Sequence, residues 1–278
     1  MHTTPRGSYH PLMRGRIRSA LRAKIIRAIE TAQAPFFRAQ RIRFDQLDRE
    51  LSELRADLGR LSDRLIEFEV RSRRDIIYAG DQEAAAESCR FASVHLVGVR
   101  HFRRPWETLD YAVSLAPKGG MALEFGVASG NTLRRITAIR EEGHVYGFDS
   151  FEGLPEAWLS GMPAGTFART DLPEVPGAEL VVGLFADTLP GFLAEHQEPI
   201  DFVHIDSDLY SSAKTVLDLV GPRLGPGSVI VFDEYFNYPG WREHEHRAWQ
   251  EYLTHTGVRF AYVAYSYEDC QVAVRITG

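Results

Sequence analysis

Asp206 and the pair Asp233-Glu234 each directly follow a short apolar segment with the composition of a buried strand. The carboxyl ends of neighbouring parallel strands meet at one edge of a sheet, so we expect these side chains to converge there. Crowded carboxylates repel one another unless a cation lies among them, and Mg²⁺ binds through a few such oxygens together with water. The sequence therefore predicts a divalent-cation site formed by Asp206, Asp233 and Glu234. The alternatives for two of the nearby acids are a helix cap at Asp208 and a surface-loop acid at Glu234.

A glycine-containing turn follows another predicted strand, residues 121–125. Gly126 lets the backbone turn sharply beside a ligand, and Gly130 permits close approach to the free N–H groups at the start of the next helix. Asp149 ends the next predicted strand, 23 residues after Gly126, where an acid can accept both hydroxyls of an adenosine ribose. These features predict a nucleotide-type pocket. The turn lacks the Gly-x-Gly-x-x-Gly spacing, which argues against a nicotinamide dinucleotide.

Histidines near the same edge are candidate bases. His244 and His246 follow the predicted strand 228–232, and we expect Asp206 or His244 to receive a proton from an acceptor hydroxyl. The alternative for each of the two histidines is a solvated polar start of a helix. His204 lies inside a predicted strand and is expected to be a buried structural residue. Four aromatic residues are expected either to form a wall for the acceptor or to pack their own turn: Tyr235, Phe236, Tyr238 and Trp241.

The elements that position these residues alternate short β-rich segments with helical stretches from about residue 80 onward. This alternation is typical of a doubly wound α/β domain, and we predict a Rossmann-like sheet of seven strands. The last two strands are joined by residues 267–270 alone, too few for a crossover helix, so they must form an antiparallel hairpin at one sheet edge. Two helices, 81–91 and 105–115, precede the sheet. The predicted strands are 121–125, 144–148, 180–184, 200–205, 228–232, 260–266 and 271–276.

Basic residues are concentrated near the N-terminus. Residues 1–43 contain ten Arg or Lys and one acid, Glu30, whereas the remaining 235 residues contain 22 basic and 37 acidic side chains. Nucleic-acid binding needs basic residues clustered on the folded body, so we exclude nucleic acid as the main partner. Apolar residues at helical spacing from Ile17 to Ala32 predict a basic amphipathic helix that ends before Pro35. This helix either makes peripheral contact with an anionic membrane or packs as a solvated helix on its own protein.

A heptad pattern over residues 44–68 predicts a coiled-coil helix. In a parallel pair, its g and e positions give three opposite-charge pairs, one neutral pair and no like-charge pair, so charge favours a homo-oligomer. Gly59 opposes this by about 1 kcal/mol, and the alternative is that the stripe packs on the α/β domain. We therefore expect a basic segment at 1–40, a coiled-coil helix at 41–78 and the α/β domain at 80–278. The a and d positions are Phe44, Leu47, Leu51, Leu54, Leu58, Leu61, Leu65 and Phe68.

Composition sets the expected location. No apolar run approaches the ~18 residues that span a bilayer, and Arg residues interrupt the N-terminus where a signal peptide would be apolar. The only cysteines, Cys89 and Cys270, form no Cys-x-x-Cys pair. We expect a cytoplasmic protein held together by burial rather than by disulfides or zinc.

Four sequence motifs, taken in order with the turn at 124–130, resemble one group of enzymes. The motifs are Gly-Phe-Asp-Ser-Phe-Glu-Gly-Leu-Pro-Glu at 147–156, Gly-Leu-Phe-Ala-Asp-Thr-Leu-Pro at 183–190, Ile-Asp-Ser-Asp-Leu-Tyr at 205–210 and Phe-Asp-Glu-Tyr at 232–235. They resemble class I S-adenosylmethionine-dependent methyltransferases and, within these, the macrocin O-methyltransferase family. The resemblance covers about residues 90–276. It implies methylation of a sugar hydroxyl of a natural product, with magnesium.

The resemblance also implies roles for individual residues. The loop that holds the amino-acid end of the cofactor contains Glu124, Gly126, Ser129 and Gly130. The residues implied for the adenosine end are Asp149 at the ribose, Ser150 and Phe151 beside the adenosine, and Asp187 near the adenine. For the metal, the implied ligands are Asp206, Asp233 and Glu234; the last departs from the Asp, Asp, Asn set of catechol-type methyltransferases.

The leading hypothesis is an S-adenosylmethionine-dependent O-methyltransferase that acts, with Mg²⁺, on a hydroxyl of a sugar or glycosylated metabolite. Two alternatives belong to other classes: a methyltransferase-like oligomeric scaffold without catalysis, and a nicotinamide-dependent oxidoreductase. Titration with S-adenosylhomocysteine and NAD(P) distinguishes the three, because only the first predicts tight binding of the former and no response to the latter.

Overall fold

A computed structural model of the chain describes residues 11–140 and 144–278, with side chains from Arg18 onward. The chain divides into two units, Met1–Arg74 and Asp75–Gly278, and each is described by itself. Among the described residues, no helix is both long and apolar enough to cross a membrane.

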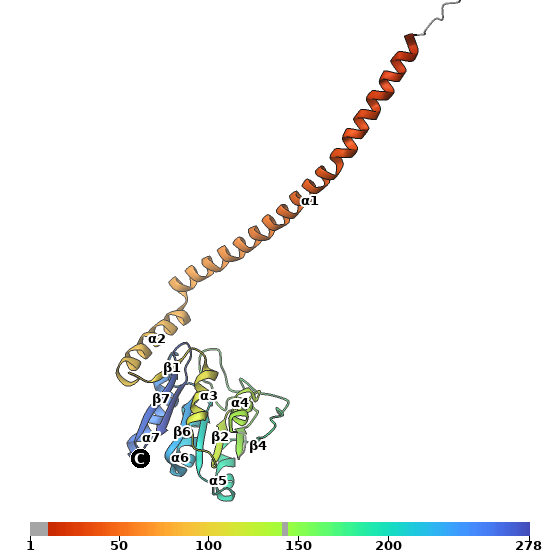
Figure 1. Cartoon of the computed structure of the whole chain (residues 1–278). Helices are drawn as coiled ribbons and strands as arrows, with labels where there is room; N and C mark the ends of the chain where they lie inside the picture. Colours follow the sequence, from red (N-terminus) through yellow and green to blue (C-terminus); the bar gives the residue numbers. More distant parts are fainter. Residues whose placement is uncertain (1–10, 141–143) are drawn as a thin grey trace, which may run out of the picture. The chain divides into compact units, whose positions relative to one another are not determined.

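The described part of the first unit is one helix, α1 (Pro11–Arg74), which continues through Pro35 (Figure 1). The prediction that a helix ends before Pro35 is wrong. A proline inside a helix removes one backbone hydrogen bond and costs about 3 kcal/mol. Alanine, the strongest helix former, recurs between residues 28 and 39, which favours continuation on both sides of the proline. The predicted boundary between the basic segment and the coiled-coil helix, at residue 40, stays a prediction, because α1 has no break there.

The described residues of the second unit form one sheet of eight strands in the order β1-β7-β8-β6-β5-β2-β3-β4. Seven strands were predicted; the additional one is β1 (Arg100–Phe102), which pairs in parallel with β7. It has only three residues, two of them exposed, so its sequence carries no alternation from which a strand can be predicted. The other strands are β2 (Met121–Phe125), β3 (Val145–Asp149), β4 (Glu179–Val182), β5 (Ile200–Ile205), β6 (Leu224–Phe232), β7 (Phe260–Ser266) and β8 (Val272–Ile276).

The C-terminal hairpin forms as predicted, because β7 and β8 pair antiparallel. Since β8 also pairs antiparallel with β6, it is the one reversed strand in an otherwise parallel sheet. The predicted place of the hairpin at the sheet edge is wrong. Strand β1 lies outside β7 and pairs with its outer side.

Helices cover both faces of the sheet (Figure 1). Alternate residues of a strand point to opposite faces, so Leu123 of β2 packs in the cluster with α2, α5, α6 and α7, whereas Ala122 packs in the cluster with α3 and α4. The helices of this unit are α2 (Ile76–His95), α3 (Pro105–Leu115), α4 (Asn131–Arg140), α5 (Phe185–Glu195), α6 (Tyr210–Val220) and α7 (Glu245–Thr256), with short 3-10 helices at Gly221–Arg223 and Trp241–Glu243.

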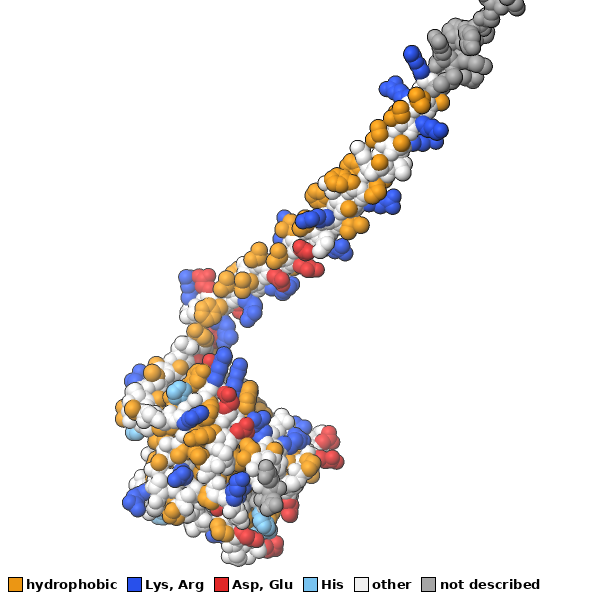
Figure 2. Space-filling view, in the orientation of Figure 1, with side chains coloured by type: hydrophobic (Ala, Val, Ile, Leu, Met, Phe, Trp, Pro, Cys, Tyr) orange, Lys and Arg blue, Asp and Glu red, His pale blue; other side chains and the backbone are white. Residues whose placement is uncertain are grey.

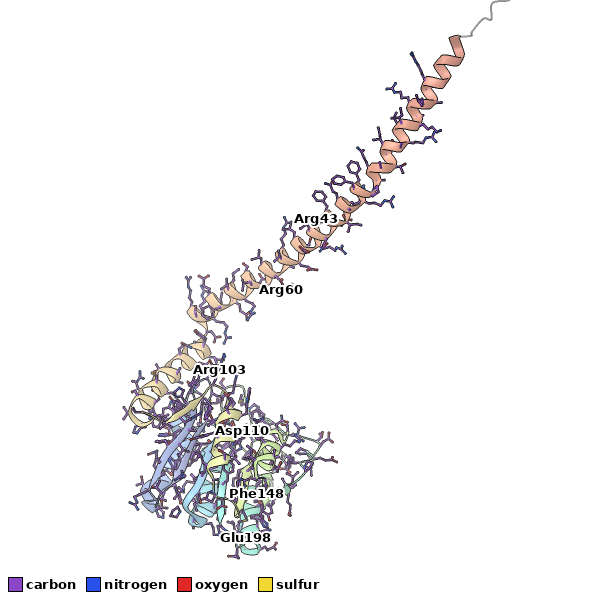
Figure 3. The ribbon with its side chains drawn as sticks, in the orientation of Figure 1. Arg43, Arg60, Arg103, Asp110, Phe148 and Glu198 are labelled. Carbon is purple, nitrogen blue, oxygen red and sulfur yellow. The ribbon has the colours of Figure 1, made fainter. Side chains whose placement is uncertain are left out.

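Side-chain contacts fix the layers around the central strands. Asp110 of α3 accepts a hydrogen bond from Arg135 Nε of α4 at 2.9 Å, and Phe148 of β3 stacks on Phe125 of β2 with ring centroids 4.9 Å apart. Figure 3 labels Asp110 and Phe148 in the second unit. The first contact joins α3 to α4, and the second supports the parallel pairing of β2 with β3. Their carboxyl ends, which carry the sequence motifs, therefore meet at one edge of the sheet.

Candidate active site

A cavity of about 470 Å³ opens at the carboxyl ends of the central strands. This volume lies within the range of small-molecule sites. Its lining includes Gly126 and Ala128 after β2, Asp149 and Ser150 after β3, Gly183 to Ala186 after β4, Asp206 to Asp208 after β5, and Glu234 after β6. The predicted pocket is thus found at the predicted sheet edge.

Gly126 lies where the turn after β2 meets the turn after β5. Its φ is +96°, and a Cβ at this position would lie 1.7 Å from the carbonyl oxygen of Asp206. Only glycine combines this backbone conformation with so close an approach. Gly130 approaches a different part of the chain, since a Cβ there would lie 2.8 Å from Val175 Cγ2.

We expect Gly126→Ala to lower the free energy of unfolding by about 3 kcal/mol or more, because the new methyl group must push two strand ends apart. Urea denaturation measures the change. The matched control is Gly191→Ala in α5, where a Cβ meets nothing within 4 Å and φ is not positive. If both variants unfold at the wild-type urea concentration, the described approach of the two turns is wrong.

The carboxylate of Asp149 is already engaged by the backbone. Its Oδ2 accepts hydrogen bonds from the amides of Val127 and Ala128 at 2.9 and 2.8 Å, and its Oδ1 accepts one from the amide of Phe151 at 2.7 Å. A carboxylate offers about four lone-pair sites. Asp149 therefore holds the turns around the cavity and retains the capacity for one further hydrogen bond, rather than for the two expected from a ribose.

Three of the eight residues predicted for the cofactor line the cavity: Gly126, Asp149 and Ser150. Of the other five, Phe151 is only 7% exposed and packs in the core, and Asp187 is exposed in the first turn of α5. The predicted cofactor residues outside the lining formed by the described residues are Glu124, Ser129, Gly130, Phe151 and Asp187.

Sequence analysis missed other lining residues. Trp158 and Phe167 reach the cavity from the long loop after β3, and Phe185 and Ala186 reach it from the start of α5. An aromatic residue in a loop carries no periodic signal, so its direction depends on the fold of the loop. Apolar side chains of this kind are typical walls of a small-molecule pocket.

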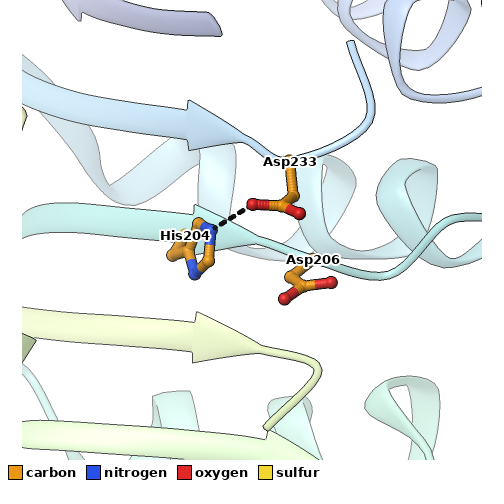
Figure 4. A group of neighbouring side chains, drawn as sticks. All are labelled: His204, Asp206 and Asp233. Atoms are coloured by element: carbon orange, nitrogen blue, oxygen red, sulfur yellow. Dashed lines mark hydrogen bonds and ion pairs between the residues drawn. The ribbon is translucent and has the colours of Figure 1, made fainter. Parts of the chain in front are cut away.

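The acids after β5 and β6 form two overlapping groups. His204, Asp206 and Asp233 offer ligand atoms within 4.8 Å of one another, and so do Asp206, Asp208 and Glu234. Figure 4 shows the first group at the ends of the two neighbouring strands. The predicted acids thus lie in one region, with Asp206 shared between the groups and Asp208 as an additional member.

Asp208 does not cap α6, so this alternative is wrong. The N-terminal cap of α6 is Leu209, and no side chain makes a capping hydrogen bond there. Asp208 is 8% exposed, lines the cavity and has a φ of +60°. Residues held in the left-handed region cost free energy and cluster at functional sites. The signal in the sequence was the repeated acid in Asp206-Ser207-Asp208.

His204 is fully buried, as predicted, and bridges two acids. Its Nδ1 lies 2.9 Å from Oε1 of Glu124, and its Nε2 lies 3.2 Å from Oδ1 of Asp233. Burial alone would lower the pKa of His204, but hydrogen bonds to Asp233 and Glu124 outweigh it and raise this pKa well above its usual value. A protonated His204 therefore stabilises both carboxylates.

The remaining acids lack such compensation. Burial, with repulsion from Asp233, raises the pKa of Asp206 and of Glu234 well above the usual value and that of Asp208 to about 7. Burial would also raise the pKa of Asp233, but the hydrogen bond from His204 outweighs it and this pKa is lowered. The site thus concentrates more negative charge than its own cationic groups balance.

This donor set fits a hard divalent cation. Its atoms are carboxylate oxygens, which Mg²⁺ and Ca²⁺ prefer. Oε2 of Glu234 is buried and has no hydrogen-bond partner among the described residues. Such an oxygen beside Asp206 and Asp208 is costly to bury alone and is a natural cation ligand.

Glu245 is a buried acid that sequence analysis did not identify. It is 0% exposed at the start of α7, and its Oε2 accepts a hydrogen bond from the amide of Glu234 at 3.0 Å. An acid in the first turn of a helix is usually an exposed partner of the helix dipole, so the sequence did not indicate burial. Glu245 fixes the turn that carries Asp233 and Glu234.

We expect Glu245→Ala to lower the free energy of unfolding by about 1–3 kcal/mol, because the buried amide of Glu234 loses its acceptor. Glu245→Gln keeps an acceptor oxygen and should cost less. Urea denaturation of both variants, with Glu243→Ala as the exposed control, measures this. Equal losses for Ala and Gln at position 245 would contradict the role of the hydrogen bond.

His244 lies behind the cavity wall. Its ring centroid is 6.4 Å from that of Trp158, which lines the cavity, and His244 itself is not among the described lining residues. Burial lowers the pKa of His244. His246 is 9% exposed inside an aromatic cluster, and burial lowers its pKa to about 4. The proposed solvated helix start is therefore wrong for His246.

The aromatic turn packs in the core rather than against the cavity. Tyr235 and Trp241 surround Phe91 of α2 with ring centroids 6.0 and 5.6 Å away. The packing alternative is confirmed for the four aromatic residues, each of which is at most 8% exposed: Tyr235, Phe236, Tyr238 and Trp241.

A comparison with known protein families matches the central part of the chain. Residues 123–235 match the family model described as a methyltransferase domain, and these residues contain the glycine turn, Asp149 and the acids after β5 and β6. This match to a methyltransferase domain agrees with the class that the motifs predicted, the class I S-adenosylmethionine-dependent methyltransferases.

A curated relative is 8-demethyl-8-(2,3-dimethoxy-alpha-L-rhamnosyl)-tetracenomycin-C 4'-O-methyltransferase of Streptomyces olivaceus, 27% identical over 158 residues. The alignment covers 46% of this chain and 59% of the relative. Among solved structures, the calicheamicin methyltransferase CalS11 is 26% identical, with a TM-score of 0.46 over 61% of this chain and 76% of that chain. The O-methyltransferase NovP is 21% identical, with a TM-score of 0.47 over 62% of this chain and 79% of that chain.

Proposed function

We propose that the protein transfers the methyl group of S-adenosylmethionine to a hydroxyl of a sugar or of a glycosylated metabolite. The observation that carries the proposal is the place of three acids, Asp206, Asp208 and Glu234, in the lining of the methyltransferase cavity. Methyl transfer to a hydroxyl requires loss of its proton, and a carboxylate cluster beside the cofactor serves that step. The curated relative, whose name describes a sugar O-methyltransferase, supports a sugar acceptor.

The cofactor would lie along the turns after β2, β3 and β4. Gly126 and Ala128 give it a backbone surface, and one remaining lone pair on Asp149 suits a single ribose hydroxyl. Phe185 and Ala186 would form an apolar wall for the adenine. This placement leaves the acid cluster at the methyl end of the cofactor.

Mg²⁺ would be held by Asp206 with Asp233 or with Asp208 and Glu234. When bound, the cation lowers the pKa of an acceptor hydroxyl and orients it. Asp206 is the favoured proton acceptor, because it lines the cavity and His244 does not. Fixing the hydroxyl against the cofactor supplies much of the remaining rate enhancement.

Cofactor binding and turnover test the proposal. Calorimetry should detect S-adenosylhomocysteine binding and no heat with NAD(P), and the release of S-adenosylhomocysteine should depend on an added nucleotide-linked sugar or glycoside. Chelation with EDTA should lower that release by at least about tenfold, and added Mg²⁺ should restore it. Full turnover after exhaustive chelation would exclude the cation from the reaction, and absence of both S-adenosylhomocysteine binding and turnover would favour a scaffold.

A further inference from the structure

The heptad stripe of α1 leaves large apolar side chains exposed. Leu51, Leu54, Leu58, Leu61 and Leu65 are 45–65% exposed. Figure 2 shows apolar side chains along this helix, interspersed with charged ones. Because they occupy the a and d positions of consecutive heptads, they share one side of the helix. A contiguous apolar stripe of this kind marks an interaction surface.

We propose that residues 44–68 pair with the same residues of a second copy as a parallel coiled coil. The flanking charges favour this partner, because the g position of each heptad faces the next e position of the other copy. Three of the four facing pairs are oppositely charged and none is like-charged. The pairs are Arg43 with Asp48, Glu50 with Arg55, Asp57 with Ser62, and Arg64 with Glu69.

The same charges favour an antiparallel pair less, because its opposite-charge pair of Glu50 with Arg64 is accompanied by like-charge pairs. With the seams fully overlapped, antiparallel helices bring g beside g and e beside e. Asp57 would then face Asp57 of the second copy, and Arg55 would face Arg55. Like charges at such close positions are destabilising. Gly59 does not affect the choice, because it occupies a b position away from the seam and a Cβ there would meet nothing within 4 Å.

Sedimentation velocity of the full chain tests self-association. The wild type should show about twice the chain mass of 31.4 kDa. Leu51→Lys with Leu58→Lys should raise the dissociation constant by at least about a thousandfold, because four buried leucines are lost per pair. The matched control is Ile66→Lys with Val70→Lys, since these residues are 58% and 54% exposed but lie at b and f positions. A monomeric wild type, or equal masses for both variants, would overturn the proposal.

A charge exchange tests the orientation and does not depend on core substitutions. Glu50→Arg alone should weaken the pair by about tenfold, because it places like charges opposite Arg55. Adding Arg55→Glu should restore wild-type association in a parallel pair. In an antiparallel pair the double variant would stay weak, because position 50 faces Arg64 in that arrangement and Glu50→Arg places two like charges there. Failure of the restoration would overturn the parallel arrangement.

A second apolar stripe on α1 lies off this seam. Continuing the heptads toward the N-terminus places Gln40, Gln33 and Glu30 in the seam. Phe37 and Ile26 also fall there, so this part of the seam is only partly apolar. Other apolar residues of this half occupy c, f and g positions, and four of them are 50–61% exposed. These four are Leu21, Ile25, Ile29 and Phe36. Pairing through residues 44–68 therefore leaves this stripe uncovered.

We infer that the N-terminal stripe binds an anionic membrane surface. Residues 18–43 contain seven Arg or Lys and one acid, Glu30. Long basic side chains beside an apolar stripe reach lipid headgroups while the stripe enters the interface. A parallel coiled coil would present two such segments at the same end, which strengthens binding through avidity.

Vesicle co-sedimentation tests this inference. The full chain should bind vesicles of phosphatidylcholine with phosphatidylglycerol at least about tenfold more tightly than phosphatidylcholine alone. Ile25→Glu with Ile29→Glu should abolish binding. Ala23→Glu with Ala34→Glu makes the same charge change away from the stripe and should retain most of it. Absence of binding to anionic vesicles, or equal losses for both variants, would overturn insertion of the stripe.

Discussion

Asp206→Asn should lower the rate of methyl transfer by at least about 100-fold and change the affinity for S-adenosylhomocysteine by less than about threefold. Asp206 belongs to both groups of potential cation ligands and lines the cavity. Asparagine has the same shape but can neither receive a proton nor balance a cation. Steady-state turnover and calorimetry on the same preparation separate the two effects.

Matched variants make this result specific. Asp218→Asn, an exposed acid of α6 that pairs with Lys214, should leave turnover unchanged. Asp233→Asn should be as damaging as Asp206→Asn, whereas Glu234→Gln should be milder, because Asp206 and Asp208 remain as charged ligands in its group. If Asp206→Asn turns over within about threefold of the wild-type rate, Asp206 takes no part in the reaction.

Asp149→Ala should weaken S-adenosylhomocysteine binding by at least about 100-fold. Three backbone amides lose their acceptor, so the turns after β2 and β3 lose the contact that shapes the cavity. A lost ribose hydrogen bond adds to this. Calorimetry measures the affinity, and Asp171→Ala in the exposed part of the loop after β3 serves as the control.

Deoxy analogues separate the ribose contact from the structural role. In the wild type, removing the ribose hydroxyl that contacts Asp149 should weaken binding, and in Asp149→Ala the same removal should have little further effect. If every deoxy analogue loses equal affinity in both proteins, Asp149 shapes the turns and makes no ribose contact.

Much of the fold could be predicted because buried strands carry a strong local signal. Residues 121–125, 200–205 and 260–266 have the predicted bounds. The short strand β1 carried no such signal, since pairing with β7 rather than its own sequence makes Arg100–Phe102 a strand. The predicted helix end before Pro35 was wrong for the opposite reason. Proline is a local helix breaker, but its helix-forming neighbours outweigh it.

The acids of the site could be predicted from their place after strands, but their partners could not. Glu124 was assigned to the cofactor, yet it lies directly beside His204 in the register of β2 and β5 and forms a hydrogen bond with it. Register depends on the packing of whole strands, which the spacing of a motif does not reveal. The same limit applies to Phe151, whose motif position suggested the cavity and whose side chain packs in the core.

The most direct test of the proposed function follows a labelled methyl group. The full chain, Mg²⁺ and S-adenosylmethionine with a deuterated methyl group are incubated with cell extract and with a panel of nucleotide-linked sugars and glycosides. The account predicts a product that carries one deuterated methyl group on a sugar oxygen, located by tandem mass spectrometry, and its loss in Asp206→Asn. A labelled methyl group found only on nitrogen or carbon, or a product formed equally by Asp206→Asn, would contradict it.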